Sequence, residues 1–148
     1  MGTLTIAAAQ FAPVDDPAAN LDTIQTFAAD IDVRFAAAAQ PLDGPFVTGL
    51  RQIARDTGLA LVVGVAETAD VPGRFRNTLV TVRPDGTLDV AYRKVHLYDA
   101  FGARESDRIE AGDPGQLAVF ELAGVRVGLE TCYDLRFPEV TRRLAAPQ

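Results

Sequence analysis

The sequence predicts a layered α/β domain with a mixed sheet, and three observations lead to this expectation. Apolar runs of strand length alternate along the chain with segments of helical periodicity. Two pairs of expected strands are joined by short turns containing Gly or Pro, which is typical of antiparallel hairpins. The 148 residues, 48% of them hydrophobic, are enough for one domain with a sizeable core. We therefore expect residues 1–148 to form a single domain of stacked helices and strands.

The N-terminal third is expected to hold one strand and two helices. The segment TLTIAAAQ (3–10) is typical of a short buried strand, and a helix should follow with Asp16 as its N-cap and Pro17 at its first position. A second helix is predicted to begin at Pro45 and to end at Gly58. Its buried stripe is predicted to comprise Val47, Leu50, Ile53 and Ala54.

Strands are expected to dominate the remainder of the chain. The expected strands are 59–67, 77–82, 87–94, 116–122 and 125–131. The first of these, LALVVGVAE, is a continuous apolar run and predicts a strand that is buried on both faces. The next two flank the turn RPDG, and the last two flank Ala123-Gly124, so each pair predicts a hairpin. The segment FPEVTRRLAA (137–146) should begin a final helix.

Composition argues against several classes of partner. The formal net charge is -6, and no basic run is longer than Arg142-Arg143, so we expect no binding of nucleic acid or of an anionic membrane. The N-terminus lacks the basic region of a signal peptide, and no apolar run has membrane-spanning length. A single cysteine cannot form an internal disulfide, which fits a reducing cytoplasm.

The one cysteine, Cys132, lies in GLETCYDLRFPE, between an apolar run and a proline that can open a helix. Backbone N–H groups at a helix start stabilise a thiolate, which is how a thiol becomes a nucleophile. The alternative is a buried structural residue, because free cysteine often behaves as a small hydrophobe. Position alone leaves both interpretations open.

The one lysine, Lys94, is also singular, because the other thirteen basic residues are arginines. This usage suggests a site that needs a compact ammonium group with three donors, although one lysine among many surface charges can also arise by chance. The sole histidine, His96, lies two residues further on and raises the alternative of a Cys-His dyad. A lone histidine, however, more often makes structural hydrogen bonds.

Three blocks resemble the nitrilase, or carbon-nitrogen hydrolase, superfamily, and they occur in the order typical of that family. They are YRKVHLYD, RESDRIEAGD and GVRVGLETCYDLRFPE. The resemblance implies an α-β-β-α sandwich, usually a homodimer, with a Glu-Lys-Cys triad that hydrolyses amides or nitriles without a metal or organic cofactor. By motif, Cys132 matches the nucleophile, Lys94 the lysine, and Glu105 an additional glutamate near the triad.

The resemblance also implies a mechanism that suits these residue types. The thiolate of Cys132 would attack the carbonyl carbon of a small amide, while Lys94 and the Tyr133 backbone N–H stabilise the oxyanion. A carboxylate would carry protons to the leaving amine and from the incoming water. A thioester intermediate and released ammonia would follow.

The chain departs from the family pattern in two places. The family carries its general-base glutamate at the end of the second strand, before the PLDGP segment, whereas the first glutamate of this chain is Glu67. The chain also ends within the helix after Cys132, so we expect an N-terminal portion of the fold with an internal deletion. Two hypotheses follow: a thiol-dependent hydrolase in which Glu67 or Glu105 serves as base, or a catalytically inactive family member. A hydrolase that uses His96 with Cys132 is a third.

Overall fold

The computed structural model describes residues 36–102, 104–116 and 118–146. The predicted strand 3–10 and the first predicted helix lie outside these residues. The helices are α2 (Pro45–Thr57) and α3 (Pro138–Ala145), with short 3-10 turns at Glu105–Asp107 (η1) and Cys132–Arg136 (η2). The strands are β1 (Leu61–Thr68), β2 (Phe75–Val82), β3 (Leu88–Arg93), β4 (Val119–Leu122) and β5 (Val125–Gly128).

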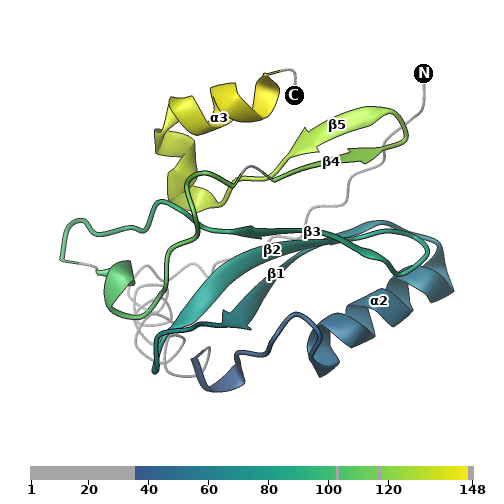
Figure 1. The fold of residues 1–148 in the computed structure, drawn as a ribbon, viewed down its shortest axis with the longest axis horizontal. Helices are drawn as coiled ribbons and strands as arrows, with labels where there is room; N and C mark the ends of the chain where they lie inside the picture. The colour runs from purple at the N-terminus through teal and green to yellow at the C-terminus, as the bar shows by residue number, and fades with distance from the viewer. Residues whose placement is uncertain (1–35, 103, 117, 147–148) are drawn as a thin grey trace, which may run out of the picture.

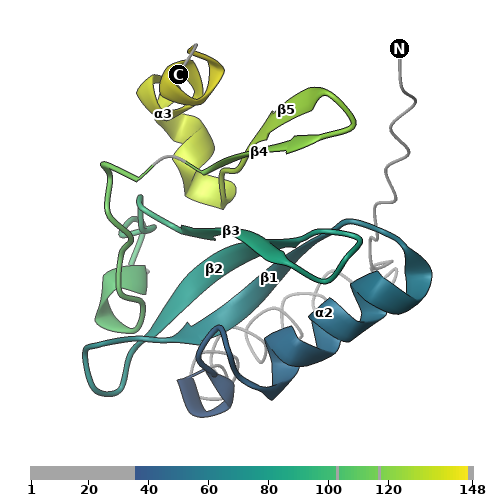
Figure 2. The same cartoon turned by 45° about the vertical axis from the view of Figure 1, so that its right-hand side comes forward.

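The described elements form layers, as predicted. Strands β1, β2 and β3 make an antiparallel sheet in that order, and β4 and β5 make a separate hairpin. Figures 1 and 2 show α2 on one side of the three-stranded sheet and the β4–β5 hairpin, followed by α3, on the other. The core between the sheet and the hairpin contains Tyr92, Ala118, Phe120 and Leu129.

Both predicted hairpins are confirmed, because β2 pairs with β3 and β4 pairs with β5, both antiparallel. Their turns also have the backbone conformation that their sequences favour. In the β2–β3 turn the Gly86 N–H donates to Arg83 O at 2.8 Å, and Gly86 has a φ of 81°, which glycine adopts without strain. Between β4 and β5, Ala123 and Gly124 both have positive φ, as the type I′ turn of a two-residue hairpin loop requires. The strands β4 and β5 are shorter than expected.

Helix α2 has the predicted ends, but its buried face is rotated from the predicted one. Pro45 begins the helix, and Gly58 caps it in the left-handed conformation. Val47 and Ala54 are buried, whereas Ile53 is 51% exposed, so its predicted burial is wrong. The reason is that Arg51, on the stripe of Val47 and Ala54, faces the sheet side, where its Nε donates to Gly86 O at 2.8 Å.

The prediction for β1 is also wrong in part. The strand exists, but its residues alternate between more and less exposed, and Val62 is 50% exposed. Within the described ranges, β1 is paired along its length with β2 only, and an isolated bridge from Gln40 to Glu67 is its other contact of this kind. An apolar run therefore does not by itself show that both faces are covered.

No helix among the described residues is long and apolar enough to cross a membrane.

Candidate active site

Lys94 and Glu105 form an ion pair where β3 ends. The backbone N–H of Lys94 still donates to Asn77 O of β2 at 2.9 Å, which fixes the residue at the sheet. Its Nζ lies 2.6 Å from Glu105 Oε2, and its side chain is only 2% exposed. The Tyr98 N–H donates to the same oxygen at 2.7 Å. Both of these contacts are made by Oε2 of the Glu105 carboxylate.

The segment that carries Glu105 is held against the sheet on both sides of the residue. The Glu105 N–H donates to Tyr98 O at 3.1 Å, and a parallel bridge joins Ile109 to Phe75 at the start of β2. Further on, the Gly112 N–H donates to Lys94 O at 2.9 Å. A Cβ at Gly112 would overlap the main chain of Arg93, so this approach requires glycine. These anchors place Glu105 over the ammonium group.

Cys132 is the first residue of η2, the turn between β5 and α3. Its φ is 53°, a left-handed conformation that non-glycine residues adopt at a cost and that is enriched at functional sites. The thiol is exposed, so the interpretation of Cys132 as a buried structural residue is wrong. Within the described part of the chain, its Sγ makes no hydrogen bond to Lys94, Glu105 or His96.

Asp134, two residues after Cys132, connects this turn to the end of β3. Its Oδ1 accepts from the backbone N–H of His96 at 2.9 Å and lies 2.8 Å from the ring Nδ1 of the same residue. Its Oδ2 accepts from the Tyr92 hydroxyl at 2.6 Å and from the Thr131 N–H at 3.1 Å. The carboxylate is fully buried.

These contacts set the ionisation of the pair Tyr92 and Asp134. Burial by itself would raise the pKa of the Asp134 carboxyl, but the hydrogen bonds from Tyr92 and His96 outweigh it and hold that pKa below its ordinary value. Burial raises the pKa of the Tyr92 hydroxyl, and the neighbouring carboxylate raises it further. Asp134 is therefore an anion that its donors stabilise.

Aromatic rings make a second link between the turn and the ion pair. The ring of Tyr133, next to Cys132, meets the ring of Tyr98 edge-on at 5.1 Å, and the Tyr98 N–H bonds to Glu105. The His96 ring stacks on Phe137 at 3.7 Å. Because His96 is held by Asp134 and Phe137 and makes no bond to the thiol, the geometry gives the Cys-His dyad no support.

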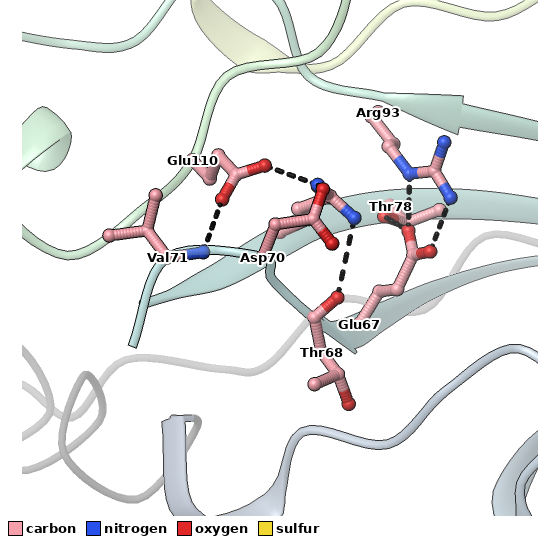
Figure 3. A network of polar contacts seen from close by, with 8 residues as sticks. Glu67, Thr68, Asp70, Val71, Thr78, Arg93 and Glu110 are labelled. Atoms are coloured by element: carbon pink, nitrogen blue, oxygen red, sulfur yellow. Dashed lines mark hydrogen bonds and ion pairs between the residues drawn. The ribbon is translucent and has the colours of Figure 1, made fainter. Parts of the chain in front are cut away.

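Both carboxylate oxygens of Glu67 are bound by side chains of β2 and β3. It accepts from Thr78 Oγ1 at 2.8 Å and from Arg93 Nε at 2.7 Å, and the Arg93 Nη2 completes a two-pronged ion pair (Figure 3). Hydrogen bonds to Glu67 raise the pKa of Arg93 above its usual value. Arg93 and Lys94 are consecutive residues at a strand end, so their side chains leave opposite faces of the sheet. Glu67 is thus on the face away from Lys94, and this geometry gives no support to the hypothesis that it serves as the base.

A second group of charges in Figure 3 anchors the segment after η1. Arg76 on β2 binds Asp70 at 2.6 Å and also binds Glu110, while Glu110 accepts from the Val71 N–H at 2.9 Å. The Val71 N–H, and after it the Arg76 guanidinium, lower the pKa of Glu110 below its ordinary value. This network fixes the chain five residues beyond Glu105.

Sequence reasoning missed three contributors to this geometry: Asp134, Tyr98 and Arg93. Only Asp134 had a local signal, because a threonine followed three residues later by an acidic residue is typical of a helix N-terminus. Among the residues that the structure describes, no group of three or more His, Cys, Asp or Glu side chains could hold a metal ion.

Comparison with known proteins identifies the family. Residues 31–148 match the family model of carbon-nitrogen hydrolases. A hydrolase of Mycobacterium tuberculosis is 37% identical over 164 aligned residues, covering 96% of this chain and 57% of the relative. A deaminated glutathione amidase of Escherichia coli O157:H7 is 40% identical over 76% of this chain and 40% of its own length. The chain thus spans about half the length of these relatives.

The match to the mycobacterial hydrolase runs over more positions than this chain has residues, so that relative contains internal residues with no counterpart here.

Solved structures agree with this assignment. The protein XC1258 of Xanthomonas campestris, a CN-hydrolase superfamily protein with an arsenic adduct in its active site, is 34% identical and superposes with a TM-score of 0.61 over 72% of this chain and 37% of that one. A variant of the amidase of Nesterenkonia sp. AN1 is 28% identical with a TM-score of 0.59 over 81% of this chain and 41% of that one. Its active-site cysteine carries the acetamide moiety of fluoroacetamide. The fold, the family model and these relatives show that this chain belongs to the carbon-nitrogen hydrolase family, within the nitrilase superfamily.

Proposed function

We propose that this protein carries the nucleophile, Cys132, and the oxyanion donors for hydrolysis of the carbon-nitrogen bond of a small amide or nitrile through an acyl-enzyme, and that completion of the reaction depends on its general base. One observation supports the proposal most strongly: an exposed cysteine at a strained turn is connected, through Asp134, to the strand end where buried Lys94 is paired with Glu105. An exposed thiol, an ammonium and a carboxylate are the groups that thiol-dependent acyl transfer needs.

In the proposed reaction with an amide, Cys132 Sγ bonds to the carbonyl carbon and its proton passes by way of a carboxylate to the nitrogen. Lys94 and the Tyr133 backbone N–H stabilise the oxyanion. The Asp134 N–H makes the first main-chain hydrogen bond within the turn, to Thr131 O at 3.1 Å. The Tyr133 N–H lies one residue before this bond, and this position suits the role of oxyanion donor. The C–N bond then breaks, ammonia leaves, and water hydrolyses the thioester to restore the thiol.

The hypothesis of a catalytically inactive family member depends on whether the site has a general base. Glu67 is held by Arg93, which leaves Glu105 as the carboxylate in contact with Lys94 among the described residues. A glutamate that already neutralises the ammonium is a weaker candidate base than an unpaired one, and proton transfer is worth about 10²- to 10⁴-fold in rate. We therefore expect activated esters to acylate Cys132, and we expect no measurable turnover of simple amides. This outcome is that of an inactive family member with an intact nucleophile.

The test compares two substrates on the same protein. 4-Nitrophenyl acetate needs no proton on its leaving group, so it should give a burst of 4-nitrophenolate that Cys132→Ala abolishes. Propionamide should release no measurable ammonia under multiple-turnover conditions. No burst would overturn the proposed nucleophile. Steady ammonia release abolished by Cys132→Ala would show that the complete reaction proceeds, and Glu105→Gln would then test whether Glu105 is the base.

A homodimer, a single domain and a cytoplasmic location stay predictions from the sequence.

A further inference from the structure

We propose that Asp134 is a positioning residue that holds the turn of Cys132 against the strand end that carries Lys94. The inference rests on the proposed function, because it concerns the placement of the proposed nucleophile beside the proposed oxyanion donor. Asp134 acts through other residues: its carboxylate is fully buried and is bound by Tyr92, His96 and Thr131.

The contacts of Asp134 are placed on both sides of Lys94. Tyr92 and His96, which contact the carboxylate, are two residues before and two residues after the lysine. Within the described residues, every hydrogen bond between 92–98 and 131–137 goes to Asp134. The Thr131 N–H, just before Cys132, is also bound to it at 3.1 Å. One carboxylate therefore carries the hydrogen bonds that join these two distant segments, beside the ring contacts of His96 with Phe137 and of Tyr98 with Tyr133.

The site requires a carboxylate rather than an amide. Each oxygen accepts one backbone N–H: Oδ1 accepts that of His96 at 2.9 Å, and Oδ2 accepts that of Thr131 at 3.1 Å. In an Asp134→Asn variant the NH₂ group would face one of these two N–H groups whichever way the amide turned, because a backbone N–H cannot become an acceptor. The substitution keeps the shape of the side chain but opposes one donor to another, so one segment must move.

The measurement is the rate of alkylation of Cys132 by iodoacetamide, which needs no catalytic turnover. Because Cys132 is the one thiol of the chain, the rate reports this site alone. Four proteins form a cycle: the wild type, Asp134→Asn, Lys94→Met, and the variant with both changes. A displacement of about 1 Å can cost about 10²-fold in rate, so we expect Asp134→Asn to slow alkylation by about tenfold or more.

The cycle separates positioning from general damage. If Asp134 acts by placing the thiol near the ammonium, Lys94→Met should clearly slow the alkylation of Cys132 in the wild-type background. In the Asp134→Asn background the same substitution should change the alkylation rate little. Glu67→Gln is the matched control, because it also alters a buried, hydrogen-bonded carboxylate but on the other face of the sheet. It should lower the melting temperature without slowing alkylation. Tyr92→Phe, which removes a single bond to Oδ2, should show the pattern of Asp134→Asn in weaker form and serves if that variant does not fold.

Two results would overturn the inference. One is wild-type alkylation in a folded Asp134→Asn or Tyr92→Phe protein with a lowered melting temperature, which would show a purely structural carboxylate. The other is a Lys94→Met effect of the same size with and without Asp134. Failure of the proposed function is a separate result: it would appear as coupled alkylation rates together with no acylation by 4-nitrophenyl acetate.

Discussion

If Lys94 and Glu105 form a buried ion pair, substituting one partner should lower the free energy of unfolding by a different amount than substituting the other. Lys94→Met leaves a carboxylate that is 23% exposed and still bound by the Tyr98 N–H, so it should lower the free energy of unfolding by about 1–2 kcal/mol. Glu105→Gln leaves an ammonium that is 2% exposed without a counter-charge, and removing one partner of a buried pair costs about 3–5 kcal/mol. Glu105→Gln should therefore destabilise the protein more than Lys94→Met.

Urea denaturation of the two single variants and the double variant measures this asymmetry. We expect the double variant to be more stable than Glu105→Gln alone, because it removes the unpaired ammonium. The coupling between the two sites should be about 2 kcal/mol. Effects that add within about 0.5 kcal/mol, or a larger loss for Lys94→Met than for Glu105→Gln, would refute the buried ion pair as described.

Two further predictions follow from the buried carboxylates. Because the pKa of Asp134 is lower in the folded than in the unfolded state, its contribution to stability is present above about pH 4, the ordinary aspartate value, and is lost as the pH falls through the folded value. Thermal unfolding should thus show a smaller loss between pH 5 and pH 2 in Asp134→Asn than in the wild type, whereas equal losses would contradict the assignment. Glu67→Gln should lower the free energy of unfolding by about 1–3 kcal/mol, because it weakens the bonds to Arg93 and Thr78, and it should leave the burst with 4-nitrophenyl acetate unchanged. A lost burst would restore Glu67 as a candidate for the chemistry.

The sequence was sufficient where local signals decide the structure. The ends of α2 at Pro45 and Gly58, and the turn at Ala123-Gly124, follow from the backbone preferences of residues at those positions. Ile53 and Val62 were misplaced because burial depends on which neighbours cover a face, and an apolar pattern does not contain that information.

For the candidate site, too, local motifs were predictable from the sequence and contacts between distant segments were not. Cys132, Lys94 and Glu105 were candidates from motifs, and Lys94 contacts Glu105 in the fold, whereas their convergence on Cys132 stays a prediction. The ion pair between Glu67 and Arg93 was not predictable from sequence spacing, because it depends on β1, β2 and β3 lying side by side. The role of Asp134 joins residues that are 38 and 42 positions apart and emerges only in the folded chain.

The central claim is that Cys132 is a nucleophile served by Lys94, and intact-protein mass spectrometry tests it most directly. After brief incubation with 4-nitrophenyl acetate and quenching in acid, the wild type should gain the mass of one acetyl group, and peptide mapping should place it on Cys132. Lys94→Met should acquire the group more slowly, and Cys132→Ala should not acquire it at that position. An unmodified wild type, acetylation at another residue, or equal rates with and without the ammonium would contradict the account.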